Sequence, residues 1–93
     1  MTLEFKDVQF FRAEETEKAG KQILVVSGLA FHSSMTVSGI EEVREDDFKI
    51  LIVNLSLAEP SKSGSFEYEI IIEPELNSIK FGKEKHEIWS RTR

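Results

Sequence analysis

Two histidines and a pair of serines are the side chains of this sequence that could support nucleophilic catalysis. His32 is followed directly by Ser33 and Ser34, and His86 lies near the end of the chain. A Ser-His-Asp triad needs the fold to bring its members together, with the serine presented on a sharp turn. Adjacent residues of a strand point to opposite faces, and no such turn surrounds these serines. The sequence therefore predicts no catalytic residues and no enzyme.

Five acidic residues form the densest charge in the chain. They are Glu41, Glu42, Glu45, Asp46 and Asp47. A calcium loop places its acidic ligands at alternating positions before a glycine, and that pattern is missing here, so we expect no metal site. A solvated turn is the simplest interpretation, and a weak calcium site is one alternative. The other is a patch that binds a basic partner, which makes these five residues candidate partner-binding positions.

Carboxylates and aromatic rings could also serve a sugar ligand. Glycoside hydrolysis needs one carboxyl group in an apolar pocket and a second one nearby. Glu67 and Glu69 alternate with Phe66 and Tyr68, so we expect both glutamates on the solvent-exposed face of a strand. Trp89 could form a platform for a sugar, although a core position is the simpler interpretation. A sugar-binding role makes Trp89 a further candidate binding residue.

Composition narrows the classes of protein to consider. The chain has 93 residues and no cysteine, which predicts one domain without disulfides or cysteine-bound zinc. Its net charge is −5, and this acidity argues against nucleic acid as a partner. No apolar stretch is long enough to span a membrane, and no cofactor motif is present. The start lacks the apolar core of a signal peptide, so we expect a cytoplasmic protein, or an extracytoplasmic one if an export signal has been removed.

The elements that must position these residues are strands. Residues 48–57 and 66–72 are rich in β-branched and aromatic side chains, and the segment 59–64 between them has the residues of a turn. Further strands are expected around 23–26 and 35–37, and a last hairpin from 79–81 and 87–89 around 82–85. The pattern predicts an all-β fold, a small antiparallel β-sandwich of the immunoglobulin-like type with seven or eight short strands.

Three segments are harder to interpret. Leu3, Phe5, Val8 and Phe10 change parity at residues 6–7, which predicts a first strand with a β-bulge there. Residues 12–20 are polar and end in glycine, so we expect a short helix at about 12–19 or a loop. Residues 39–47 fit a capped helix or a strand bulged at residues 38–39, and the strand is favoured. Gly28 is expected to break or bulge the second strand.

Three strands are apolar on both faces, over residues 23–26, 50–53 and 70–72. A two-layer sandwich covers only one face of each sheet. The second face needs a cover from a loop, a crossing strand or another protein, unless these side chains are simply exposed.

These patterns favour a non-enzymatic module that binds a protein partner or a second copy of itself, through an edge strand or the second apolar face. An acidic inhibitor or immunity-type protein that masks a basic partner is the first alternative, and a carbohydrate-binding module is the second. A small-molecule ligand is not expected.

Overall fold

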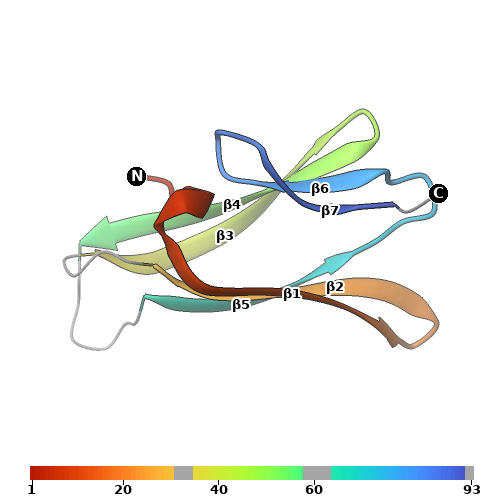
Figure 1. Cartoon of the computed structure of the whole chain (residues 1–93), viewed down its shortest axis with the longest axis horizontal. Coiled ribbons are helices and arrows are strands. Elements are labelled where there is room, and N and C mark those ends of the chain that lie inside the picture. Colours follow the sequence, from red (N-terminus) through yellow and green to blue (C-terminus); the bar gives the residue numbers. More distant parts are fainter. Residues whose placement is uncertain (31–34, 58–63, 92–93) are drawn as a thin grey trace.

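The computed structural model describes residues 1–30, 35–57 and 64–91, which form two packed β-sheets (Figure 1). One sheet has the strand order β1-β2-β5 and the other β3-β4-β6-β7. In chain order the elements are the 3₁₀ turn η1 (Phe5–Asp7) and the strands β1 (Val8–Lys18), β2 (Lys21–Ala30), β3 (Met35–Glu45), β4 (Phe48–Leu57), β5 (Ser65–Ile71), β6 (Ser78–Phe81) and β7 (His86–Ser90). The all-β, two-sheet expectation is confirmed. Within the described residues, η1 is the only helical turn, and no helix is long and apolar enough to cross a membrane.

One strand pair departs from the predicted antiparallel arrangement. β6 lies parallel to β4, with Phe48 opposite Ser78 and Leu51 opposite Phe81. All other named pairs are antiparallel. The chain leaves β4, crosses to the three-stranded sheet as β5 and returns as β6, and a crossover of this kind can join parallel neighbours whereas a hairpin cannot. The prediction of an entirely antiparallel sandwich is therefore wrong at this pair.

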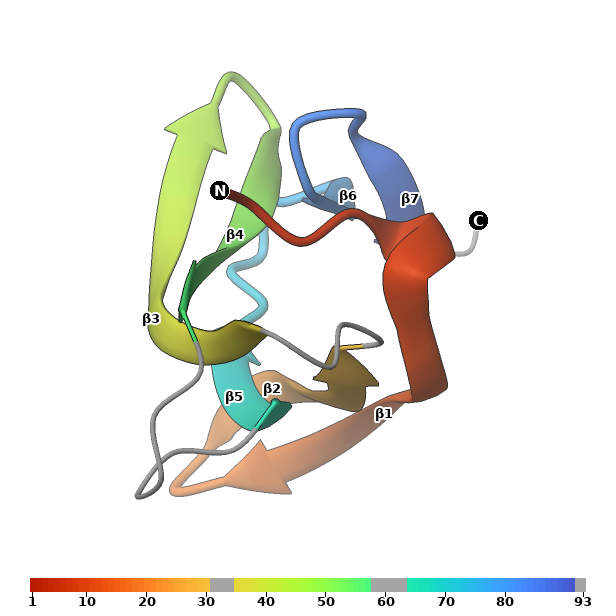
Figure 2. The ribbon, with the colours of Figure 1, turned by 90° about the vertical axis from the view of Figure 1, so that its left-hand side faces the viewer.

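The first three residues belong to the four-stranded sheet. The Leu3 amide donates to the carbonyl oxygen of Val53 at 2.9 Å, and the Leu55 amide donates to that of Met1 at 2.8 Å. The chain then crosses through η1 to the other sheet and begins β1 (Figure 2). The bulge predicted at residues 6–7 is wrong, because the change of parity there comes from this 3₁₀ turn.

Residues 12–18 continue β1, so the expected helix or loop at 12–20 is wrong. The polar side chains fit an edge strand, which pairs with β2 along one side and meets water on its outer face. Ala19 and Gly20 both have positive φ, at 51° and 79°, as a two-residue β-hairpin turn requires. Tertiary pairing with an apolar neighbour has overridden the weak strand propensity of this segment.

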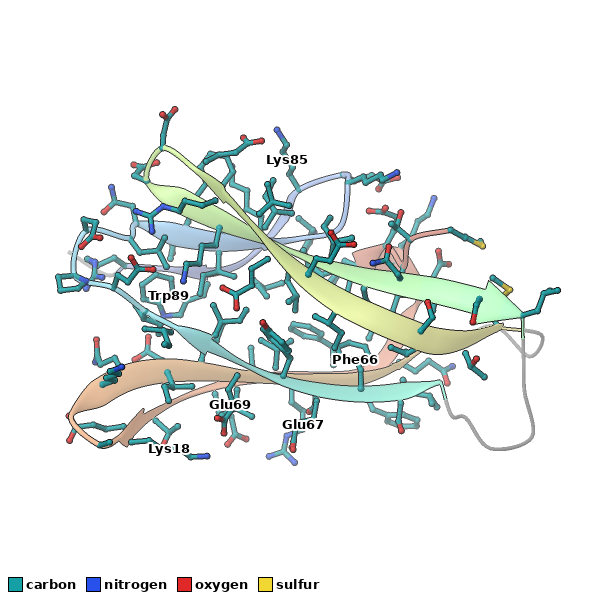
Figure 3. The ribbon with its side chains drawn as sticks, turned by 180° about the vertical axis from the view of Figure 1, so that it is seen from behind. Lys18, Phe66, Glu67, Glu69, Lys85 and Trp89 are labelled. Carbon is teal, nitrogen blue, oxygen red and sulfur yellow. The ribbon has the colours of Figure 1, made fainter. Side chains whose placement is uncertain are left out.

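The core lies between the sheets. Leu24, Val26 and Ile70 of the three-stranded sheet face Leu51 and other apolar residues of the four-stranded sheet. Phe66 points into the same space, as Figure 3 shows. Because exposed and buried positions alternate along β5, the glutamates of that strand point away from the core, as predicted.

Gly28 does not break its strand. β2 runs through it, and the irregularity lies opposite, where two β1 residues occupy the space of one. A Cβ atom at Gly28 would lie 2.5 Å from a Val8 methyl carbon and 3.1 Å from the Phe66 ring. Close packing against these side chains, rather than a bulge in β2, is what requires glycine there.

Two other predictions are confirmed. Residues 39–45 are strand, with the register shift between Val37 and Gly39, so the helical alternative is wrong. The last hairpin, β6 and β7, is also present. Its loop is held by the Glu4 carboxylate, which accepts the amides of Lys83 at 3.1 Å and Glu84 at 3.0 Å. The predicted turn at 59–64 and the residues His32, Ser33 and Ser34 lie outside the described residues, apart from Gly64.

Candidate functional site

The second apolar face of the four-stranded sheet is partly covered from within the chain. Ile50 is buried but lies outside the core cluster, and its cross-strand neighbours are Val43 and Lys80. The Lys80 ammonium lies 4.1 Å from the centre of the Phe48 ring, so its aliphatic stem crosses this face. Val43 remains 39% exposed. The Lys80 stem therefore covers part of this face, and Val43 stays partly exposed.

The acidic residues of the β3–β4 hairpin do not form one patch. Glu41 accepts a hydrogen bond from the Asn54 amide at 2.7 Å, and Glu45 pairs with Lys85 at 3.6 Å. Glu42 points the other way, between the sheets, since adjacent residues of a strand face opposite sides. The three glutamates are thus divided between two faces of β3.

The two aspartates occupy the hairpin turn. Asp46 has a φ of 37°, and its carbonyl oxygen accepts the Arg44 Nε at 3.2 Å. The Asp47 carboxylate accepts the Asn77 side-chain amide at 2.7 Å. Both residues therefore have local structural contacts. Within the described residues, no group of three or more His, Asp or Glu side chains is arranged to hold a metal ion.

A charged network closes the side of the sandwich between β3 and β5. Lys49 is only 11% exposed, and its ammonium lies 2.8 Å from Glu73 and 3.3 Å from Glu42. It also donates to the carbonyl oxygen of Ile71 at 3.1 Å, which occupies an edge group of β5. Hydrogen bonding to Lys49, its positive charge and the nearby Arg44 hold the pKa of Glu73 below its usual value. The network links the two sheets.

Tyr68 joins this network from β5. Its hydroxyl donates to Glu42 at 2.6 Å. This hydrogen bond, together with burial and the negative charge of Glu42, raises the pKa of Tyr68 to about 12. The phenol therefore keeps its proton at neutral pH and acts as a donor between the sheets.

Trp89 closes the opposite side, between β1 and β7. It packs against the core cluster and its indole Nε1 donates to Glu15. The Arg91 guanidinium lies 5.5 Å from the ring. Figure 3 shows the indole between the two sheets. This position matches the simpler expectation of a packed residue and offers no open aromatic platform. His86 is likewise engaged, stacked on Phe5 with ring centres 3.8 Å apart.

The most unusual residue lies on the outer face of the three-stranded sheet. Phe10 is 79% exposed and has a φ of 55°. Phe10 and Phe11 together oppose Gly28, so they form a β-bulge. Glycine usually fills a left-handed bulge position, and a bulky residue with positive φ is an outlier. Phe11 turns inward against Phe5 and Phe81, which leaves the Phe10 ring in solvent.

Two adjoining hollows surround this bulge, and we call them together the outer-face groove. The larger has a volume of about 570 Å³ and is lined by Phe10, Ser27, Gly28, Leu29, Ser65, Phe66 and Glu67. The smaller, of about 170 Å³, is lined by Arg12, Glu14, Val25, Ser27 and Glu67. They share Ser27 and Glu67, so the two shallow hollows adjoin each other across β1, β2 and β5.

Charged side chains border the outer-face groove. Arg12 pairs with Glu14 at 2.5 Å, and Lys18 pairs with Glu69. Figure 3 shows Glu67 and Glu69 projecting from this sheet away from the other one. The face thus combines an exposed ring, a shallow apolar hollow and a charged border, which are the usual components of a protein-binding surface.

A further hollow of about 570 Å³ lies at the end of the β1–β2 hairpin. It is lined by Gly20, Lys21, Gln22, Ile71, Ile72, Glu73, Pro74 and Arg91. Two of its charged side chains already have partners within the chain. Arg91 donates to the carbonyl oxygens of Leu76 and Glu73, and the Glu73 carboxylate binds Lys49. It is therefore the weaker candidate for a binding site.

Sequence reasoning missed Phe10, although a signal was present. Phe10 and Phe11 are adjacent in a segment that becomes an edge strand, and two adjacent aromatic rings cannot both face one core.

No family model, no curated protein and no solved structure matches the chain.

Proposed function

We propose that this chain is a non-enzymatic β-sandwich module that binds a protein partner through the outer-face groove. The observation that carries the proposal is Phe10, an exposed aromatic residue held in a backbone conformation that suits glycine. Its ring adds little to the core, and its backbone strain opposes folding. A binding role explains both features, because aromatic residues are enriched at the centres of interfaces.

The net charge of −5 has a secondary part in this proposal. It attracts a basic partner and speeds encounter, as in the acidic inhibitor alternative. The acidic residues 41–47 are not proposed as the contact surface, because Glu41, Glu42, Glu45 and Asp47 each have a partner within the chain. The carbohydrate alternative needs an open tryptophan ring, and the position of Trp89 gives it no support.

The finer fold assignment is part of the proposal. Two packed sheets of three and four strands support an immunoglobulin-like, single-domain interpretation, whereas the parallel β4–β6 pair departs from the antiparallel sheets of that fold.

The test compares capture of a partner by three forms of the chain. The native protein, Phe10→Asn and the matched control Val43→Asn, which alters an exposed apolar residue of the other sheet, are immobilised and exposed to native-cell extract. We expect the native protein and Val43→Asn to retain the same partner, and Phe10→Asn to lose it. Equal retention by all three would exclude this surface, and no specific retention by the folded native protein would overturn the proposed function.

A further inference from the structure

Glu67 is a charged residue of the outer face that has no ion-pair partner in the part of the chain that the structure describes. Glu69 pairs with Lys18, and Glu14 pairs with Arg12. The Glu67 carboxylate has neither an ion pair nor a hydrogen bond within residues 1–30, 35–57 and 64–91. It lines both hollows of the outer-face groove. Among the described residues, the groove thus offers a carboxylate without an ion pair where the two hollows meet.

The larger hollow presents an aromatic ring to whatever approaches that charge. Phe10 and Glu67 both line it, and the ring is 79% exposed. A guanidinium group is planar, stacks on aromatic faces and can donate two parallel N–H groups to one carboxylate. An ammonium group is a more strongly hydrated point charge, and an uncharged side chain would leave the carboxylate unpaired. The combination of ring and carboxylate therefore favours arginine.

We infer that the outer-face groove binds an arginine side chain of the partner protein, an inference that rests on the proposed function. The aliphatic stem crosses the hollow beside Leu29, the guanidinium donates to Glu67, and its plane lies against the Phe10 ring. The chain's own Arg12 also lines the smaller hollow, but its ion pair is with Glu14 at 2.5 Å rather than with Glu67. The overall charge of −5 favours the approach of a cationic segment.

The inference is tested with capped amino acids on the full-length, isotope-labelled chain. N-acetyl-arginine methylamide is titrated while amide and aromatic ring signals are followed by NMR, in parallel with the corresponding lysine, norleucine and glutamate amides. We expect the arginine probe to shift signals around Phe10, Ser27 and Glu67, and to bind more tightly than the other three. Glu67→Gln should weaken arginine binding about five-fold and Phe10→Asn about two- to five-fold, the scale of exposed ion pairs and cation–π contacts.

Glu17→Gln is the matched control, because Glu17 is also an exposed carboxylate of this sheet but lines neither hollow. It should leave arginine binding unchanged. Equal weakening by Glu17→Gln, or norleucine binding as well as arginine, would overturn the inference. So would shifts spread over the acidic residues 41–47. If a partner is lost from Phe10→Asn in the capture experiment while the arginine probe does not bind, the arginine inference fails and the proposed function stands.

Discussion

Replacing Phe10 with asparagine should leave the stability of the fold nearly unchanged. The residue is 79% exposed, so about 40 Å² of a ring of about 200 Å² is buried, and losing it costs about 1 kcal/mol. Against this, an L-residue in the left-handed region carries about 1–2 kcal/mol of strain, and asparagine adopts that conformation more readily than phenylalanine. The two effects oppose each other, and the net change in the free energy of unfolding should lie within about 1 kcal/mol.

Phe81→Ala is the control for this prediction, because it truncates a buried aromatic ring. Phe81 is 0% exposed and packs edge-on against Phe5 and Phe11, so its truncation should cost about 3–5 kcal/mol. Urea unfolding followed by circular dichroism measures both variants, and equal slopes against denaturant would show that the same surface unfolds. A loss of more than about 2 kcal/mol for Phe10→Asn would mean that the ring supports the fold, and the reasoning from exposure to binding would then fail.

Three further changes test the packing and the charged network. Gly28→Ala should destabilise the fold by about 1–3 kcal/mol, because the new methyl group meets the valine of β1; truncating that valine to alanine as well should restore part of the loss in the same unfolding assay. Lys49→Met should lower stability at pH 7, since Glu42 and Glu73 lose their shared cation. The pKa of Glu73 is lowered in the folded chain, so its contribution to stability should be present at neutral pH and should be lost as pH falls from the ordinary carboxyl pKa through the lower folded one. Lys49→Met should show a weaker dependence, since Arg44 remains, and an identical acid profile would contradict the assignment. Ultraviolet titration should find a pKa of about 12 for Tyr68, and Glu42→Gln should bring that pKa closer to 10. Because the folded pKa is raised, this tyrosine stabilises the fold less as pH rises from about 10 to 12.

The apolar strands could be predicted because their residue types indicate both a β-strand and its burial in the core. The runs at 48–57 and 66–72 are β-branched or aromatic over several residues, and they became β4 and β5 with one face in the core. The β3 bulge was also predictable, since Ser38 and Gly39 interrupt an otherwise regular strand. In these segments, local propensity and tertiary packing favour the same structure.

The other features of the fold depend on neighbouring strands that the local sequence does not reveal. Residues 12–18 are a strand only because β2 pairs with them, and β6 lies parallel to β4 only because the chain crosses between sheets first. The strain at Phe10 arises from the register of β1 against β2, in which two residues oppose Gly28. The candidate site therefore could not be predicted from composition or charge, which pointed to the acidic residues 41–47 instead.

The most direct test of the proposed interface is site-specific photocrosslinking. Benzoylphenylalanine is placed at position 10, on the three-stranded sheet, or at position 43, an exposed apolar position of the other sheet. Each form is irradiated with the captured partner, and the adducts are separated by mass. We expect an adduct from position 10 and none from position 43. An adduct from position 43 with none from position 10 would place the interface on the opposite face and contradict the account.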